Sequence, residues 1–318
     1  MSRAFTVEEA DDGIRLDRWV KRHLPDVPFV AVAKWARTGR LRLDGAPARP
    51  GDRIHAGQTI TLPEADDRPP RARARESPPL SPDEEAFARS LVLHRSDHAL
   101  VLNKPPGLAT QGGTGTMAHV DRLLEALRFG ARERPRLVHR LDRDTSGVLL
   151  VARSARAAAF FSQRFAQRDT RKIYWALLMG VPRLPDLRVE LPIARQPGTG
   201  GEKMQVDEAR GSPAVSRIRV MDRAGDRVAF AELRPITGRT HQLRVHAAAI
   251  GHPIVGDGKY GGRAAFLTGG VSRKLHLHAR RLVIDLPEGG RLDVTAPLPA
   301  HFAQSLELLG LEPDSEGA

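Results

Sequence analysis

The sequence predicts an α+β fold, in which a small N-terminal α/β module precedes a larger domain with a mixed, mainly antiparallel sheet and flanking helices. Short apolar or alternating runs, typical of strands, follow one another in pairs separated by turn residues. Helical patterns do not alternate regularly with these runs, which argues against a doubly wound parallel sheet. A proline-rich, highly charged stretch at residues 64–82 divides the chain.

The first part, residues 1–63, carries two predicted helices and a small β unit. The first helix places apolar residues on one face and basic residues on another, namely Leu16, Trp19, Val20 and Leu24 against Arg15, Arg18 and Arg22. A second helix is predicted from Phe29 to Arg37, because the pattern stops at Gly39. The segments RLRLDG and ITLP predict the β unit around Asp44–Gly45.

Residues 64–82, EADDRPPRARARESPPLSP, contain five prolines, dense mixed charge and almost nothing to bury. This composition is typical of an extended, disordered linker. We therefore expect three parts: a module over residues 1–63, a linker over residues 64–82 and a second domain over residues 83–318.

The second domain opens with a predicted hairpin, LVLHR and ALVLNK around the turn at residues 96–98. SRIRVM and RVAFAEL predict another hairpin, with its turn at residues 222–226. The stretch KLHLHARRLVIDL and the following DVTAPLP predict two more strands. Helices are expected near residues 155–169, 241–250 and 299–309.

The charge balance indicates a polyanionic partner. The chain has 50 Lys and Arg against 38 Asp and Glu, a net charge of +12, which favours a nucleic acid over a membrane surface. The alternative is an Arg-rich proteome without functional meaning. Zero cysteines exclude disulfides, thiolate catalysis and Cys-ligated metals. We find no span of membrane length and no secretory signal, and we expect a cytoplasmic protein.

Ionisable residues crowd the start of the buried strand predicted at Val148–Val151: His139, Arg140, Asp142, Arg143 and Asp144. Two carboxylates two residues apart raise the possibility of a glycosidase pair. Arg140 and Arg143 would keep both ionised, which argues against a general acid and favours a single nucleophilic or electrostatic carboxylate. The alternative interpretation is that both are ordinary turn residues.

The sequence gives only weak support for a dinucleotide-binding site or a metal site. Gly112, Gly113 and Gly115 approach a dinucleotide-binding pattern but open no convincing helix. Two histidine pairs, His241 with His246 and His276 with His278, lack further ligands at metal-site spacing. We therefore expect no metal and no cofactor.

Three segments, taken in order, form a more specific pattern: HRLDRDTSG at 139–147, KIYWALLMG at 172–180 and RPITGRTHQLRVHAAAIGHPIVGD at 234–257. Together they resemble the motifs of RluA-type pseudouridine synthases. The resemblance spans about Leu91 to Leu286 and includes VLNKPPGLATQGGTG at 101–115. It is greatest to the branch of the family that acts on large-subunit ribosomal RNA.

The resemblance implies an α+β, cofactor-independent isomerase that converts uridine to pseudouridine. It implies that Asp142 is the catalytic aspartate, that Tyr174 stacks on the target base and assists proton transfer, and that Arg244 pairs with the aspartate. Six further residues would shape the pocket or hold RNA: Arg140, Thr145, Arg239, Thr240, His241 and Gln242. An ionised carboxylate paired with Arg, beside an aromatic wall for an extruded base, suits this chemistry.

The first module resembles the αL RNA-binding motif of ribosomal small-subunit proteins. This implies that six residues grip RNA phosphates: Arg15, Arg18, Lys21, Arg22, Lys34 and Arg37. The alternative is a solvated charged face. We expect ribosomal RNA as the partner, no membrane and a monomer. A non-catalytic ribosome-assembly factor, a synthase acting on transfer RNA and a nucleoside hydrolase or glycosidase are the competing hypotheses.

Overall fold

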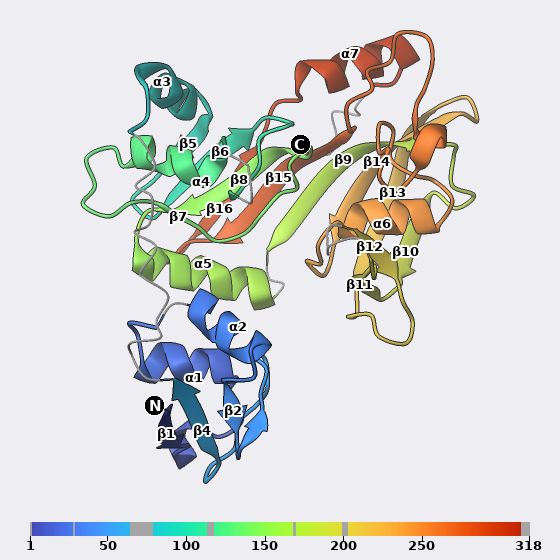
Figure 1. Ribbon diagram of the computed structural model, residues 1–318. Helices are drawn as coiled ribbons and strands as arrows, with labels where there is room; N and C mark the ends of the chain where they lie inside the picture. Colours follow the sequence, from blue (N-terminus) through green and yellow to red (C-terminus); the bar gives the residue numbers. More distant parts are fainter. Residues whose placement is uncertain are drawn as a thin grey trace. The chain divides into compact units, whose positions relative to one another are not determined.

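The computed structural model describes residues 2–27, 29–63, 79–112, 118–167, 170–198 and 203–312. The chain divides into two compact units, Met1–Pro78 and Pro79–Ala318 (Figure 1). Most of the predicted linker, residues 64–78, lies outside the described residues. Its last residues include the start of helix α3 (Pro82–Ser90), where Ser81 and Glu84 form a reciprocal capping box.

The N-terminal unit contains a four-stranded antiparallel sheet in the order β1-β4-β2-β3. The strands are β1 (Ser2–Thr6), β2 (Arg42–Leu43), β3 (Ala46–Pro47) and β4 (Thr59–Pro63), with helices α1 (Leu16–His23) and α2 (Phe29–Arg37). Asp44 and Gly45 both have positive φ, 49° and 78°, as a tight hairpin turn requires. Both predicted helices and the β unit are confirmed, whereas strand β1 was not predicted.

The core of this unit joins the predicted apolar helix face to the sheet. Leu16, Trp19 and Val20 of α1 are buried with Trp35 of α2 and Ile60 of β4. The basic residues of α1 therefore remain on the opposite, solvent-facing side of the helix, as its spacing predicts.

The C-terminal unit contains a ten-stranded sheet whose main path runs β10-β13-β14-β9-β15-β8-β6-β5. In chain order the strands are β5 (Val92–Arg95), β6 (Ala99–Lys104), β7 (Arg136–Leu137), β8 (Ser146–Ala152), β9 (Arg171–Met179), β10 (Asp186–Glu190), β13 (Val215–Ala224), β14 (Val228–Pro235), β15 (Leu277–Asp285) and β16 (Arg291–Thr295). All pairs are antiparallel except β8 with β15. The predicted α+β class with a mixed, mainly antiparallel sheet is confirmed.

Helices cover both faces of each half of this sheet. Helices α3 and α4 (Val120–Leu123) pack on one face of β6 and β8, and α5 (Ala155–Gln167) packs on the other. In the other half, α6 (Gln242–Ala249) and α7 (Ala300–Leu309) pack on opposite faces of β9 and β14. A separate hairpin, β11 (Ile193–Arg195) with β12 (Met204–Val206), lies close to α6. The three predicted helices are thus confirmed, while α3, α4 and strand β9 were not predicted.

The predicted turn at residues 222–226 is partly wrong. Strand β13 continues to Ala224, which pairs with Val228, so the turn is confined to residues 225–227. A register shift between Val220 and Asp222 gives β13 one extra residue. Such a bulge lets a strand continue through residues whose alternation suggests that it has ended.

The parallel pair at the centre of the sheet depends on a glycine. Gly147 of β8 has φ of 107°, and a Cβ there would lie 2.2 Å from the carbonyl oxygen of Ala279 in β15. Next to it, the Ser146 hydroxyl hydrogen-bonds to Nδ1 of buried His278 (2.9 Å). Because β8 lies this close to β15, the ionisable turn before β8 is held at the centre of the sheet.

Candidate active site

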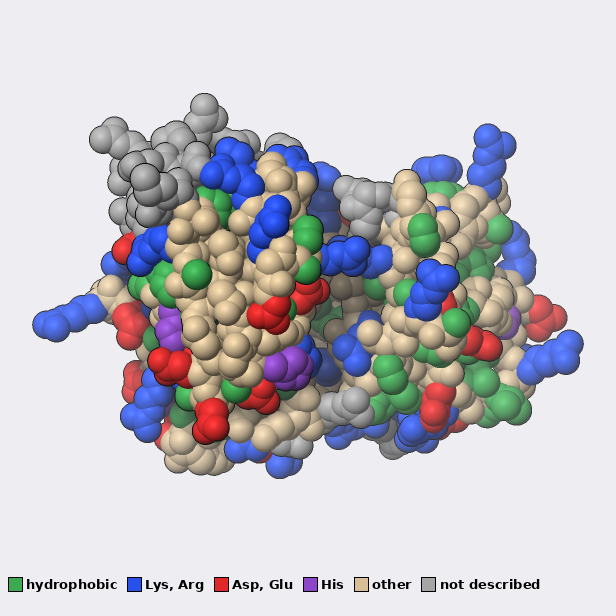
Figure 2. All heavy atoms as spheres, turned by 60° about the horizontal axis from the view of Figure 1, so that its bottom comes forward, with side chains coloured by type: hydrophobic (Ala, Val, Ile, Leu, Met, Phe, Trp, Pro, Cys, Tyr) green, Lys and Arg blue, Asp and Glu red, His purple; other side chains and the backbone are tan. Residues whose placement is uncertain are grey.

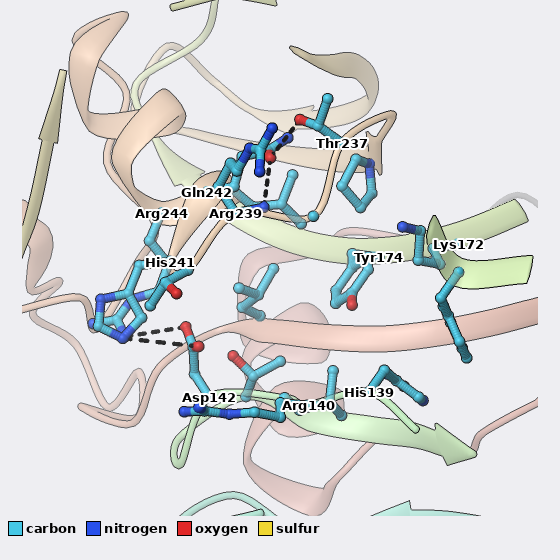
Figure 3. Close-up of a pocket in the computed structure, with 18 residues that line it drawn as sticks. His139, Arg140, Asp142, Lys172, Tyr174, Thr237, Arg239, His241, Gln242 and Arg244 are labelled. Carbon is cyan, nitrogen blue, oxygen red and sulfur yellow. Dashed lines mark hydrogen bonds and ion pairs between the residues drawn. The ribbon is translucent and has the colours of Figure 1, made fainter. Parts of the chain in front are cut away.

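A cavity of about 330 Å³ lies against β9 and β15. Three segments supply most of its walls: the turn before β8, strand β9, and the segment that leads from β14 into α6 (Figure 3). All nine residues that the sequence predicts as catalytic or substrate-binding line this cavity: Asp142, Tyr174, Arg244, Arg140, Thr145, Arg239, Thr240, His241 and Gln242. Asp144 does not line it, so the paired-carboxylate geometry of a glycosidase is not formed here.

The turn that carries Asp142 is fastened to a neighbouring loop. The Thr110 hydroxyl donates a hydrogen bond to the carbonyl of Leu141 (2.7 Å). Lys104, whose side chain is fully buried, donates through Nζ to the carbonyls of Arg143 (2.9 Å) and Leu108 (2.8 Å). Burial lowers the pKa of Lys104 to about 7, although the charges of nearby carboxylates oppose this shift. These contacts fix the backbone on both sides of Asp142.

The charge that faces Asp142 comes from Arg244. Its Nη1 lies 3.4 Å from Asp142 Oδ2, and His241 Nε2 lies 3.8 Å from Oδ1. Among the described residues, neither Arg140 nor Arg143, which the sequence places beside this carboxylate, forms an ion pair with Asp142. Arg143 directs its Nε to the carbonyl of Gly107 (3.0 Å), and Arg140 is exposed at the rim of the cavity.

Arg244 is itself held by a residue that sequence reasoning missed, Asp257. The guanidinium donates two hydrogen bonds to its carboxylate, Nε to Oδ2 and Nη2 to Oδ1, both at 2.8 Å. The Asp257 side chain is completely buried. Burial would lower the pKa of Arg244, but the hydrogen bonds and charge of Asp257 outweigh it and raise that pKa. Asp257 therefore aims Arg244 so that its remaining Nη1 reaches Asp142.

Tyr174 forms part of the wall opposite Asp142. Burial, with a further contribution from the charge of Asp142, raises the pKa of its hydroxyl. Among the described residues, this hydroxyl has no hydrogen-bond partner. At neutral pH it therefore keeps its proton, and it is available to donate a hydrogen bond to a ligand in the cavity.

The segment between β14 and α6 is shaped by Gln242. Its Oε1 accepts hydrogen bonds from the Thr237 hydroxyl (2.6 Å) and the Arg239 amide (3.0 Å), and its Nε2 donates to Ser216 Oγ (2.9 Å). Both ends of this amide are thus occupied, so Gln242 acts on the shape of the wall. His241 begins α6 in the left-handed conformation (φ 54°).

The histidines weighed as metal ligands have other partners. His246 lies between Ser216 Oγ (3.0 Å) and the Leu191 carbonyl (2.9 Å), and His276 Nε2 lies 2.8 Å from Ser305 Oγ. Within the described ranges, no group of three or more potential ligands is placed to hold a metal ion. No helix in these ranges has the length and apolarity needed to cross a bilayer.

Known proteins match this chain over nearly its whole length. The profile of the family described as RNA pseudouridylate synthase matches residues 98–249. The protein of Escherichia coli K12 named ribosomal large subunit pseudouridine synthase C is 35% identical over 316 residues, which is 96% of this chain and 95% of the relative. Its namesake from Vibrio cholerae is 31% identical over 307 residues, 94% of each chain. The chain belongs to the RNA pseudouridine synthase family.

The fold supports this assignment. The solved structure of human RNA pseudouridylate synthase domain containing 4 aligns with a TM-score of 0.61 and 31% identity, covering 73% of this chain and 98% of that one. The predicted family is confirmed, and this protein is an RNA pseudouridine synthase, an isomerase. The hypothesis of a non-catalytic assembly factor is therefore set aside.

The six cations predicted to bind RNA are all exposed in the N-terminal unit. Two of them have acidic partners: Arg15 pairs with Asp17 (2.7 Å) and Arg22 with Asp11 (2.6 Å). The other four, Arg18, Lys21, Lys34 and Arg37, make no ion pair with any described residue. Figure 2 shows Lys and Arg side chains spread over the visible face, with Asp and Glu among them. Charge alone therefore does not mark a single RNA path.

Three residues near the site were missed: Asp257, Lys104 and Lys172. Each lies in a segment that carries the resemblance. The segments were therefore recognised from the sequence, but the roles of these three residues were not. For Asp257 and Lys104 the signal is a buried partner elsewhere in the chain: Arg244 for Asp257, and for Lys104 the carbonyl of Arg143, 39 residues away. For Lys172 it is a place in the cavity. Spacing patterns of two or 3.6 residues contain no such information.

Proposed function

We propose that this pseudouridine synthase acts on uridines of large-subunit ribosomal RNA. The observation that carries this proposal is the near full-length match to enzymes named for that activity. The net charge of +12 supports a nucleic-acid substrate. We also propose a monomer as the acting form.

The proposed reaction is an isomerisation within one nucleotide. The bond between ribose C1′ and uracil N1 breaks, the base turns, and C5 attaches to C1′; C5 then loses a proton and N1 gains one. The substrate therefore needs no redox partner. The target base must first leave its stack to enter a cavity of this kind. The Tyr174 ring provides the aromatic wall against which such a base can lie.

Asp142 is the proposed catalytic residue. Its carboxylate acts on the ribose, either as a nucleophile at C1′ or as a base at C2′, and both routes need it ionised and aimed. Arg244 meets both needs, because Asp257 fixes its guanidinium with one Nη left toward Asp142 (Figure 3). Tyr174, whose raised pKa keeps the hydroxyl protonated, donates a hydrogen bond to the base or the ribose.

The remaining surface binds the RNA backbone in this proposal. A second cavity of about 660 Å³ shares Asp142, His241 and Arg244 with the first. Four more basic residues line it: Arg143, Lys259, Arg273 and Lys274. Residues 1–63 would act as an αL-type RNA-binding module, joined by residues 64–82 to the synthase domain at 83–318. Contacts of this kind position a protein on RNA without reading its bases.

Mapping pseudouridines in a strain that lacks the gene tests the proposal. We expect specific sites in large-subunit ribosomal RNA to revert to uridine, and to regain pseudouridine when the wild-type gene is restored but not when it carries Asp142→Asn. If pseudouridines are lost only from transfer RNA, then transfer RNA, and not ribosomal RNA, is the substrate.

A further inference from the structure

Lys172 lies in the same cavity as the proposed catalytic residues and has no role yet. It is two residues before Tyr174 on β9, so both side chains project from the same face of the sheet. Both line the cavity. In Figure 3, Tyr174 lies between Lys172 and Asp142. A base packed on Tyr174, with its ribose toward Asp142, would thus turn its far edge toward Lys172.

Within the described residues, the ammonium group of Lys172 has no counter-ion. No described residue forms an ion pair or a hydrogen bond with its Nζ. The neighbouring His139 is neutral, because burial and the charge of Lys172 lower its pKa to about 3. Burial also lowers the pKa of Lys172. An uncompensated cation in a partly buried position is costly to the folded protein, so the site is suited to a ligand that carries negative charge.

The reaction produces such a charge. When C1′–N1 breaks with the electron pair on N1, the detached uracil is an anion whose charge is shared by O2 and O4. In the uracil ring, C4 lies across from N1 and C2 lies across from C5. A half-turn about the line from N3 to C6 exchanges N1 with C5 and also O4 with O2. One fixed cation on the far side of the base therefore faces a carbonyl oxygen in both orientations.

We propose that Lys172 is a catalytic residue whose ammonium donates a hydrogen bond to O4 while N1 is attached to ribose, and to O2 after the base has turned. The ammonium keeps its three protons throughout, since it stabilises the uracil anion between the two bonds and does not protonate it. The proposal rests on the assignment of this cavity to the target uridine.

The test compares three full-length variants in single-turnover reactions with an RNA fragment that the wild-type enzyme modifies. Lys172→Met removes the charge and keeps most of the side-chain volume, and Lys172→Arg keeps the charge. Arg171→Met is the matched control, because Arg171 is adjacent on β9 but points to the other face and does not line the cavity. Loss of one donor to a developing anion slows catalysis by about 100-fold or more. We expect that loss for Lys172→Met, partial recovery for Lys172→Arg and near wild-type rates for Arg171→Met.

Two further readouts separate catalysis from folding. RNA affinity of Lys172→Met should stay within a few-fold of wild type, and its melting temperature should stay equal or rise, because an unpaired buried charge has been removed. In addition, 5-fluorouridine at the target position forms a more stable uracil anion. Because its C5 carries fluorine and has no proton to lose, the reaction is followed by nucleoside chromatography as consumption of 5-fluorouridine. That consumption should be less sensitive to Lys172→Met than conversion of uridine is.

Several outcomes would overturn the proposal. Wild-type rates for Lys172→Met would show that the ammonium has no part in the reaction. Equal losses with uridine and 5-fluorouridine would show that it does not act on the departing base, and a lowered melting temperature with lost binding would make Lys172 structural. If the wild-type enzyme modified no ribosomal RNA at all, the proposed substrate would fail instead, and the comparison would be repeated with the RNA that it does modify.

Discussion

The basic residues of the two units differ in what surrounds them. In the N-terminal unit, the proposed RNA-binding cations stand in solvent, and two of the six share their charge with Asp11 and Asp17. In the catalytic unit, Arg244 is almost fully buried and has two carboxylate partners, whereas Lys172 is partly buried and has none among the described residues. Both sets are positive, but water screens only the first strongly.

This difference predicts a division of labour. Exposed cations contribute to affinity through phosphate contacts, each of small and salt-dependent effect. Buried cations act where water is excluded, so their effect falls on the reaction rate and on folding. Substitutions in the catalytic unit should therefore change turnover at saturating RNA, whereas those in the module should change binding. The following predictions test this division, beginning with the largest effect.

Asp142→Asn should abolish isomerisation, with a loss of at least about 1,000-fold in the single-turnover rate, because it removes the group that acts on the ribose. The fold should persist, since Arg244 keeps its bidentate bond to Asp257. Tritium release from uracil C5 measures the reaction, and RNA affinity serves as the control. A rate within about tenfold of wild type would contradict the catalytic role.

Arg244→Ala should affect both rate and stability. The rate should fall by about 100-fold or more through loss of the group that aims Asp142. The free energy of unfolding should fall by about 3–5 kcal/mol, because buried Asp257 loses its partner. Arg244→Ala with Asp257→Ala should regain much of the stability and none of the activity. Urea unfolding and single-turnover rates measure the two effects; a double variant that is active would remove Arg244 from the mechanism.

Mild acid should destabilise the catalytic unit selectively. Burial lowers the pKa of His139 to about 3 and that of His276 and His278 to about 4, whereas unfolded histidines titrate near 6.5. From pH 6.5 down to about 4 the unfolded chain therefore binds more protons, and the free energy of unfolding decreases as the pH falls.

The module should resist this acidification. Burial would raise the pKa of Asp11, but hydrogen bonds from His23 and Arg22 lower it, so its contribution is lost only below the usual value of 3.8. Urea unfolding at pH 7 and pH 5, read by proteolysis in each unit, should show a loss of roughly 2 kcal/mol or more in the catalytic unit alone. Earlier unfolding of the module at pH 5 would contradict the prediction.

Tyr174→Phe should slow the reaction by about 10- to 100-fold and leave RNA affinity unchanged, because the ring remains and only the hydroxyl is lost. Tyr174→Ala should lose stacking as well as turnover. The measurements are the single-turnover rate and the affinity of each variant. A fully active Phe variant would show that the hydroxyl has no chemical part, and equal loss of stability in both variants would make Tyr174 a core residue only.

Much of the fold was predictable, because it follows from local patterns. The helices over 16–23 and 29–37 carry an apolar face at helical spacing, and the hairpin at residues 92–104 carries its turn residues. Strand β9 was missed because its residues Ile173–Leu178 are apolar on both faces, as a central strand between two helical layers must be, and show little alternation.

The residues of the site also fall into two groups: those that the sequence could name and those that it could not. Residues in the recognised motifs, such as Asp142 and Tyr174, could be named from sequence, and the structure brings them to one cavity. Asp257 could not be named from sequence. Its bond to Arg244 depends on the path that the chain takes from the end of α6 to residue 257. Nor could the lack of a partner for Lys172 among the described residues be predicted, since it is a property of the packed structure.

The smallest effect is expected from the module, where four cations have no ion pair among the described residues: Arg18, Lys21, Lys34 and Arg37. Replacing all four by Gln in the full-length protein should weaken binding to the RNA substrate by about tenfold at moderate salt. The slope of log affinity against log salt should become shallower by up to about 3.6, since each of the four phosphates that the protein no longer neutralises reduces it by close to 0.9. The rate at saturating RNA should not change, since none of the four lines the cavity.

A matched control replaces four exposed arginines of the catalytic unit, Arg183, Arg188, Arg195 and Arg210, and removes the same charge. If the module variant and the control lose affinity equally, net charge rather than the module determines binding. If neither loses affinity, the basic face of α1 and α2 is a solvated surface, and RNA is held by the catalytic unit alone.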